Sequence, residues 1–172
     1  MVVLTGASGL LGQALTRQLL LDGKPLRLLL RDLDSPGFEG LLVERRQGDV
    51  LDPASLRTAF EGVETVYHCA ALPTNLPGMY DHLYQVNVQG TRNVISACRQ
   101  AGVRNLVYVA NFQAIAPGDE PGAVLTERDG FQPEKTLSDF GRTMSLACQL
   151  VMEANSGGLN TLILLPSYQM GP

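Results

Sequence analysis

A glycine-rich string between a strand pattern and a helix pattern is the feature that most restricts the fold of this chain. The string reads Thr5-Gly6-Ala7-Ser8-Gly9-Leu10-Leu11-Gly12 and follows the short apolar run 2–4. Leucines then recur at the helical spacing until Asp22-Gly23, which predicts a helix that ends there. A strand, a tight glycine turn and a helix in this order are typical of the first unit of a parallel α/β sheet.

The three glycines of this string have different expected roles. Gly6 permits the tight turn, Gly9 lets a pyrophosphate approach the backbone, and Gly12 lets the helix pack closely on the strand. Free backbone N–H groups and the positive end of the helix dipole would bind the anion. The residues expected to contact a dinucleotide here are Thr5, Gly6, Ser8, Gly9, Leu10, Leu11 and Gly12. The alternative is a glycine-rich turn that binds no ligand.

Short apolar runs alternate with helical patterns along the rest of the chain, as in parallel sheets that helices cover on both faces. Further strands are expected at 26–30, 42–46, 65–70, 106–110 and 161–165, and helices from Asp52-Pro53, at 79–101 and at 137–155, with an irregular loop at 114–134. The sequence therefore predicts one dinucleotide-binding domain over 1–172. Its fold class is α/β, a doubly wound parallel sheet with strand order 3-2-1-4-5-6.

The residues after the second and third strands predict how the adenosine end of a dinucleotide is recognised. Arg31 offers a forked cation for a 2′-phosphate, which favours NADP. Asp32 could instead accept hydrogen bonds from the ribose hydroxyls, which keeps NAD possible. Asp49 and Val50 follow the third strand and would lie beside the adenine ring. For each charged residue the alternative is a solvated surface position.

The composition excludes several classes of function. A formal net charge of −4 argues against a nucleic-acid or anionic-membrane partner, since both need a basic surface. No apolar run approaches the length that crosses a bilayer. Cys69, Cys98 and Cys148 are far apart in apolar stretches, which indicates reduced core thiols rather than disulfides or a metal site. We therefore expect a cytoplasmic protein that binds no metal.

Several motifs together resemble the extended short-chain dehydrogenase/reductase family, which includes the NAD-dependent epimerases/dehydratases and the dihydroflavonol-reductase-like enzymes. They are the glycine string, Arg31-Asp32, Gly48-Asp49-Val50, Val66-Tyr67-His68-Cys69-Ala70-Ala71, Asn87-Val88-Gln89-Gly90-Thr91 and the segment from Leu164 to Pro172. The resemblance covers the whole chain and implies a Rossmann fold that binds NADP, or NAD. It also implies that Cys69, Ala70, Ala71, Asn87 and Pro166 lie along the cofactor. His68 is predicted to border the cofactor with its backbone at the end of the strand, and the alternative is a base near the nicotinamide.

The catalytic residues of that family are missing from the matching positions. The family uses a Ser or Thr with a Tyr-x-x-x-Lys pair, in which the ammonium lowers the pKa of the phenol and the phenol passes a proton to the substrate. Here the matching positions hold Asn111, Phe140 and Met144. None of the five tyrosines has a lysine four residues later. The standard proton relay is therefore not intact.

Three functions are compatible with a dinucleotide motif beside a degenerate relay. The first is an NADP(H)-binding protein that acts as a cofactor sensor or a regulatory protein. The second is an NAD(P)-dependent oxidoreductase or sugar-nucleotide epimerase/dehydratase that works with unconventional residues, for example with the amide of Asn111 as a donor. The third is a non-catalytic interaction module. Ordinary packing is the alternative role of Phe140 and Met144, and a structural strand-end position is that of Asn111.

The resemblance also predicts how the protein assembles. Members of the family pair through two long helices, so we expect a homodimer through helices 79–101 and 137–155. The family usually continues into a smaller substrate-binding domain. That domain is expected to be largely absent from 1–172.

Overall fold

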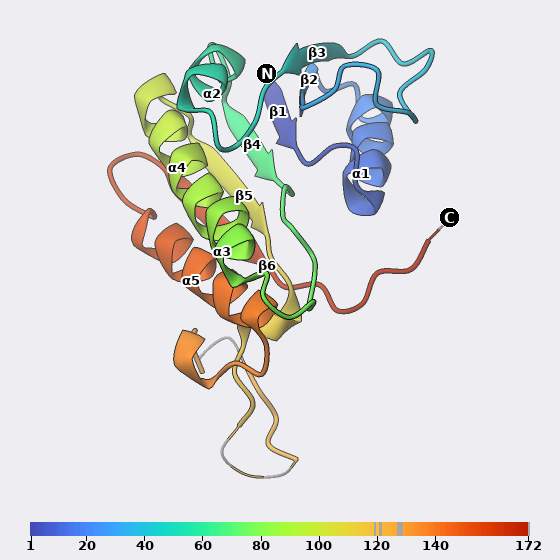
Figure 1. The fold of residues 1–172 in the computed structure, drawn as a ribbon. Helices are drawn as coiled ribbons and strands as arrows, with labels where there is room; N and C mark the ends of the chain where they lie inside the picture. The colour runs from blue at the N-terminus through green and yellow to red at the C-terminus, as the bar shows by residue number, and fades with distance from the viewer. Residues whose placement is uncertain (119, 121, 127–128, 172) are drawn as a thin grey trace.

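Six parallel strands in the order β3-β2-β1-β4-β5-β6 form the sheet in the described part of the chain (Figure 1). The computed structural model describes residues 1–118, 120, 122–126 and 129–171; Pro172, at the end of the last motif above, lies outside them. The strands are β1 (Val2–Thr5), β2 (Leu26–Leu30), β3 (Glu44–Gln47), β4 (Thr65–His68), β5 (Asn105–Val109) and β6 (Asn160–Leu164). The predicted α/β class and strand order are confirmed.

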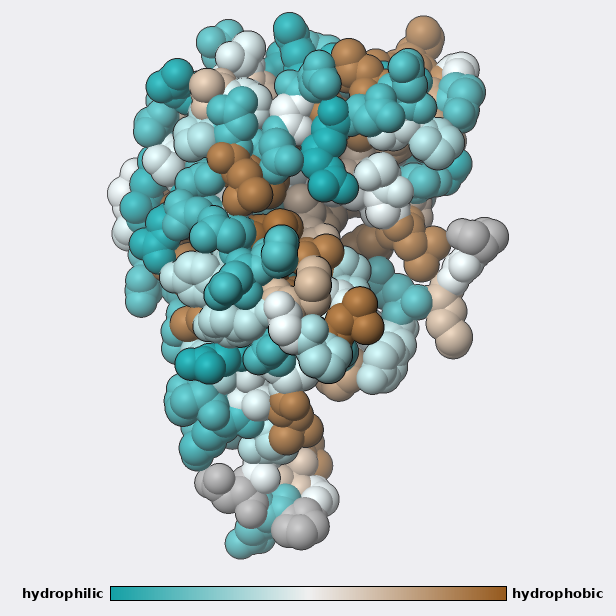
Figure 2. Space-filling model, viewed as in Figure 1, coloured by the Kyte–Doolittle hydropathy of each residue, from teal (hydrophilic) through white to brown (hydrophobic). Residues whose placement is uncertain are grey.

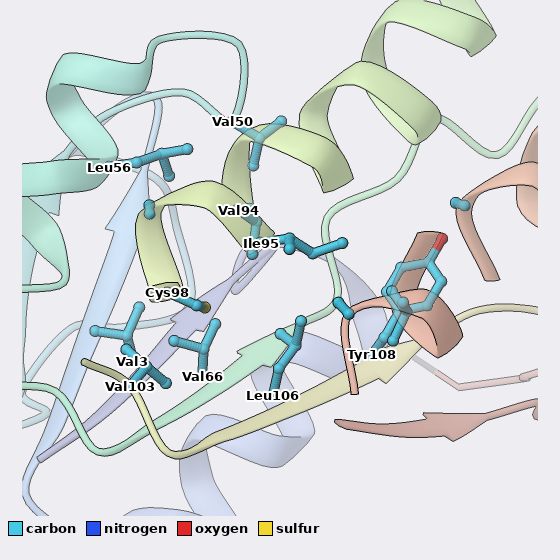
Figure 3. Packing of buried hydrophobic residues seen from close by; sticks show 14 of the residues in the cluster. Val3, Val50, Leu56, Val66, Val94, Ile95, Cys98, Val103, Leu106 and Tyr108 are labelled. Atoms are coloured by element: carbon cyan, nitrogen blue, oxygen red, sulfur yellow. The ribbon is translucent and has the colours of Figure 1, made fainter. Parts of the chain in front are cut away.

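Helices lie on both faces of this sheet. They are α1 (Leu10–Leu21), α2 (Pro53–Ala59), α3 (Tyr80–Leu83), α4 (Gly90–Ala101) and α5 (Asp139–Glu153). α1 lies on one face, and α2, α4 and α5 lie on the other (Figure 1). Successive strand side chains point to opposite faces, so Val3 packs in the core beneath α4 while Leu4 packs in the core beneath α1. Figure 3 shows the core beneath α4, where Val94 and Cys98 lie over the strands.

The strand predicted at 42–46 is wrong at its start, because β3 begins at Glu44 and Leu42 is 97% exposed. β3 is an edge strand of polar sequence. An ion pair of 3.0 Å between Arg27 Nε on β2 and Glu44 Oε2 on β3 joins it to its neighbour. The strand predicted at 65–70 ends earlier, at His68. The following residues turn along the carboxyl edge of the sheet instead of extending it.

The helix predicted at 79–101 is present but is interrupted by a π-helical segment at Tyr84–Gln89, between α3 and α4. Such segments are rare and often lie at functional sites. Asn87 and Val88 are buried in it. The segment therefore directs the polar side chain of Asn87 inward.

The loop between β5 and α5 is irregular, as expected, with short 3₁₀ turns at Phe112–Ala114 and Pro133–Lys135. Its described residues project away from the sheet (Figure 1), and Figure 2 shows apolar and polar residues mixed on this projection. Within the described residues, no helix has the length and apolar character to cross a bilayer. The same residues bring together no group of three or more His, Cys, Asp or Glu side chains that could hold a metal ion.

Candidate functional site

A cleft of 350 Å³ opens at the carboxyl ends of β1, β2 and β4. The order of the strands reverses between β1 and β4, which is where open α/β sheets bind dinucleotides. The cleft is lined by Thr5, Gly6, Ser8, Gly9, Leu29, Leu30, Arg31, Gly48, Asp49, Val50, Leu51, Cys69, Ala70, Ala71, Leu72, Pro73 and Val86. Ten of these residues were predicted to contact the cofactor.

The glycine turn forms the floor of the cleft and has no room for side chains at two of its positions. Gly6 has φ of +72°, and a Cβ added there would lie 2.5 Å from the backbone nitrogen of Ala70. A Cβ added to Gly12 would collide with the carbonyl oxygen of Gly6, so α1 packs directly on the turn. Both glycines are therefore required by close backbone packing, as the sequence predicts.

The start of α1 is open to a ligand. Gly9 is its N-cap and supplies no side-chain hydrogen bond. The first N–H groups of a helix have no carbonyl partner within that helix, and here they belong to Leu10, Leu11 and Gly12. These three predicted contacts do not line the cleft. In general, an anion binds at a helix N-terminus through such backbone donors.

Arg31 and Asp32 differ in their relation to the cleft. Arg31 is exposed and lines the cleft, and its carbonyl oxygen accepts a hydrogen bond from Gln47 Nε2 at 3.2 Å. Asp32 does not line the cleft, and its Oδ1 accepts the backbone N–H of Asp34 at 2.9 Å. The carboxylate is thus engaged in its own turn, while the guanidinium remains available to a ligand.

The loop after β3 makes the apolar wall of the cleft. Val50 is buried and Leu51 is half exposed at this wall, opposite Leu29 at the end of β2. Asp49 lines the same wall, and its Oδ1 accepts the backbone N–H of Leu51 at 2.9 Å. An apolar slot with one adjacent carboxylate can hold a flat heteroaromatic ring whose amino group faces the acid.

His68 at the end of β4 is part of a buried polar chain rather than of the cleft. Its Nδ1 lies 2.7 Å from the hydroxyl of Thr5 and its Nε2 lies 3.0 Å from that of Thr91. The hydroxyl of Thr91 donates to the carbonyl of Asn87 at 2.6 Å, so Nε2 carries the proton and Nδ1 accepts from Thr5. Burial lowers the pKa of His68 to about 4, so the ring is neutral near pH 7. These contacts give His68 a structural role.

Cys69, Ala70 and Ala71 continue from β4 and line the cleft where the family resemblance places them. The thiol of Cys69 is partly buried, and burial raises its pKa to about 12. A neutral thiol is a poor nucleophile, so Cys69 contributes surface rather than chemistry.

Asn87 lies behind the wall of the cleft, fully buried in the π-helical segment. Its Oδ1 accepts the backbone N–H of Leu72 at 2.7 Å, and its Nδ2 donates to the carbonyl of Leu72 and to the hydroxyl of Thr143, at 3.3 and 3.1 Å. The side chain therefore joins the loop after β4 to the π-helical segment and to α5. Its predicted contact with the cofactor would act through Leu72, which lines the cleft.

None of the three residues at the predicted relay positions, Asn111, Phe140 and Met144, lines the cleft. Phe140 and Met144 occupy the first turns of α5 and are 6% and 1% exposed. Asn111 caps the 3₁₀ turn after β5, where its Oδ1 accepts the N–H of Gln113 at 3.0 Å. The start of α5 packs against that turn, since a Cβ added to Gly141 would lie 2.6 Å from the carbonyl oxygen of Gln113.

Tyr108 on β5 is not placed to act as a proton donor in the cleft. Its hydroxyl donates a hydrogen bond to the sulfur of Met144 at 3.7 Å, and the ring lies 5.3 Å from that of His68. Burial raises the pKa of this phenol well above its usual value. The side chain is a neutral core residue without access to the cleft.

Seven lining residues were not among the predicted contacts: Leu29, Leu30, Gly48, Leu51, Leu72, Pro73 and Val86. Gly48 belongs to a motif that the sequence analysis used, so it could have been included. The apolar residues carry no local signal, because only their position at strand ends distinguishes them from core residues. Conversely Asp32, Asn87 and Pro166 lie outside the lining, as do the side chains at the start of α1.

The fold and the cleft define an NAD(P)-binding protein of the extended short-chain dehydrogenase/reductase class. Residues 3–172 match the sequence profile of the 3-beta hydroxysteroid dehydrogenase/isomerase family. This chain therefore belongs to that family.

Individual relatives agree with this assignment. The chain is 37% identical to sterol demethylase protein B of Methylococcus capsulatus over 99% of its own length and 52% of that protein. It is 33% identical to 2-alkyl-3-oxoalkanoate reductase of Stenotrophomonas maltophilia over 99% of its own length and 51% of that enzyme. A short-chain dehydrogenase/reductase superfamily protein from Agrobacterium tumefaciens, solved with bound NAD, superposes with a TM-score of 0.82 at 30% identity, over 96% of this chain and 48% of the other. The chain thus spans about half the length of these relatives.

Proposed function

We propose that this chain binds NADP(H) in the cleft and acts through binding, as a cofactor sensor or a regulatory protein, without the proton relay of its family. One contrast carries the proposal. The glycine turn keeps its tight packing, because a Cβ on Gly6 or Gly12 would collide with neighbouring backbone, and Gly9 at the start of α1 has no side chain that would block a diphosphate. Phe140 and Met144, at the positions of the relay, are packed as core residues and can neither give nor take a proton.

The preference for NADP over NAD is supported by the two residues after β2. A guanidinium can bind a 2′-phosphate through two parallel hydrogen bonds, and Arg31 lines the cleft. The carboxylate that would select NAD belongs to Asp32, which lies outside the lining and bonds to Asp34.

A thermal-shift titration with NADPH and NADH tests this proposal. A ligand that binds only the folded state raises the melting temperature by mass action, with ~100 Kd of ligand adding about 2.7 kcal/mol. NADPH is expected to give the larger shift at equal concentration. The absence of a shift with either cofactor would contradict the proposal.

Gly9→Val is the matched variant for this titration. Gly9 has φ of −76°, and an added Cβ would touch only the carbonyl oxygen of Gly6, at 3.4 Å, so the fold tolerates a side chain there. The valine would block the approach of a pyrophosphate and abolish the shift. Ala14→Val, at an exposed position of α1, is the control and should leave the shift unchanged.

A second candidate function is an oxidoreductase or epimerase with an unconventional donor. Asn111 is half-buried, and only its Oδ1 is engaged among the hydrogen bonds of the described residues, which leaves Nδ2 able to donate to a substrate oxygen. Consumption of NADPH with a carbonyl substrate, lost in Asn111→Ala, would favour this function. A pure interaction module is the third candidate, for which Gly9→Val would leave partner binding unchanged.

We also propose that the protein is a homodimer through the outer faces of α4 and α5. A groove of 430 Å³ between these helices includes the partly buried Leu150 beside Arg92 and Arg99. Sedimentation should give a dimer for the natural chain and a monomer for Leu150→Glu. A monomeric natural chain would contradict this part of the proposal.

A further inference from the structure

The cleft lies at one half of the sheet, at the ends of β1 to β4. Seven lining residues come from the end of β2 and the loop after β3, and the others come from the glycine turn, from the loop after β4 and from Val86. Within the described residues, none of the lining comes from β5, β6 or α5. In this fold the residue at the end of β2 recognises the adenosine ribose and the start of α1 holds the pyrophosphate. The lining from the end of β2, the loop after β3 and the glycine turn therefore fits the adenosine diphosphate half of a dinucleotide.

The nicotinamide half would have to extend from the pyrophosphate toward β5 and α5, where several polar groups are already engaged, although the fully buried hydroxyl of Ser145 on α5 has no partner among the described residues. The sulfur of Met144 accepts from Tyr108, and the carbonyl of Pro166 accepts the N–H of Phe112 at 3.2 Å. The hydroxyl of Thr143 donates to the carbonyl of Phe140 at 2.9 Å. The groups of Met144, Pro166 and Thr143 are all bonded within the protein.

The residue types at the three predicted relay positions also offer few hydrogen bonds to a nicotinamide nucleoside. A phenol and an ammonium at 140 and 144 would offer hydrogen-bond donors, whereas a benzyl side chain offers none and a thioether is only a weak acceptor. Nδ2 of Asn111 is the remaining side-chain donor at these three positions, and it lies outside the lining.

We propose that this chain recognises the phosphorylated adenosine diphosphate half of its ligand and makes no energetically significant contact with the nicotinamide nucleoside. This inference rests on the proposed function and specifies its ligand chemistry. It follows that the oxidised and reduced forms bind alike, so that a protein of this kind reports the total amount of NADP(H) and not its redox ratio.

Titration calorimetry on the whole chain tests the inference with four ligands: NADP⁺, NADPH, 2′-phospho-ADP-ribose and 2′-phospho-ADP. 2′-Phospho-ADP-ribose lacks only the nicotinamide base, whereas 2′-phospho-ADP lacks the whole nicotinamide nucleoside. All four dissociation constants are expected to agree within fivefold. A dinucleotide that binds more than fivefold tighter than 2′-phospho-ADP, or forms of the cofactor that differ by more than fivefold, would overturn the inference while leaving the proposed function intact. Absence of binding by all four, and by NAD⁺, would overturn both.

Two variants locate the contacts. Arg31→Ala is expected to raise the dissociation constants of NADP⁺ and 2′-phospho-ADP by the same factor, at least tenfold, because both ligands carry the 2′-phosphate. Asn111→Ala is expected to change neither affinity by more than fivefold. A selective loss of NADP⁺ affinity in Asn111→Ala, with a melting curve that shows a folded protein, would assign a nicotinamide contact to this residue and overturn the inference.

Discussion

The hydroxyl of Tyr108 donates a hydrogen bond to the sulfur of Met144, 3.7 Å away, in the interior between β5 and α5. Both side chains are almost completely inaccessible to water. A thioether is a weak acceptor, so this contact is a weak hydrogen bond of a buried phenol. Met144, which the sequence analysis matches to the lysine of the family, is thus part of the hydrophobic core.

Restoring the relay is the direct test of this interpretation. Phe140→Tyr with Met144→Lys places a phenol and an ammonium at the predicted relay positions, where a positioned general acid would contribute ~10²–10⁴-fold. Because both positions are buried and neither lines the cleft, the double variant is expected to reduce a carbonyl substrate with NADPH no faster than the natural chain. The rate is measured by NADPH absorbance, and Phe140→Tyr with Met144→Leu, which adds the phenol without the cation, is the control. A clear rise in the double variant alone would show that these two positions reach the reacting atoms.

Asn87 should contribute more to stability than its single side chain suggests. Replacing it with alanine leaves the backbone groups of Leu72 without their side-chain partner and removes a bond to Thr143, which is expected to lower the free energy of unfolding by about 2–4 kcal/mol. Denaturant unfolding measures this loss. Asn75→Ala, at an exposed position of the same loop region, should stay within about 0.5 kcal/mol. Similar losses for both variants would contradict the role assigned to Asn87.

The sequence predicts the sheet, its strand order and the floor of the cleft because these depend on local signals. Alternating patterns specify the strands, and the glycine spacing between a strand and a helix specifies the turn at Gly6. Leu72 and Val86 could not be assigned in this way, since an apolar residue after a strand or on a helix has the same local pattern whether it faces a cleft or a core. The π-helical segment around Asn87 was also unpredictable, because it depends on hydrogen bonds to residues 15 and 56 positions away.

The edge strand gives a second example. Leu42 and Val43 suggested a strand start by their apolar character, yet β3 consists of the polar residues 44–47. An edge strand is recognised by its pairing partner, here β2, and by contacts such as that between Arg27 and Glu44. Neither is visible in a local pattern.

Substitution by alanine should destabilise the fold at Gly12 but not at Gly9. Gly12→Ala places a methyl group against the carbonyl of Gly6 and is expected to destabilise the fold by about 1–3 kcal/mol. Gly9→Ala meets only an ordinary contact of 3.4 Å and should leave stability within about 0.5 kcal/mol. Thermal unfolding without ligand compares the two. Equal destabilisation would mean that close packing of α1 on the turn is not what requires glycine at position 12.

His68 should make the stability of this protein fall as the pH is lowered. Its pKa is lowered by burial to about 4 in the folded state, against about 6.5 in an unfolded chain. The unfolded state therefore binds the proton first, so the contribution is fully present above about pH 6.5 and is lost as the pH falls from there toward 4. A difference of this size corresponds to roughly 2–4 kcal/mol.

The measurement is the free energy of unfolding at pH 7 and at pH 4.5 for three proteins. Carboxylates contribute their own loss at the lower pH, so the comparison is between variants and not within one protein. His68→Gln is expected to lose less stability over this interval than the natural chain, because glutamine does not titrate. His82→Gln, at an exposed position of α3, controls for the removal of a histidine and should behave like the natural chain. If both variants keep the full pH dependence, then the buried chain from Thr5 through His68 to Thr91 does not hold the imidazole neutral in the folded protein.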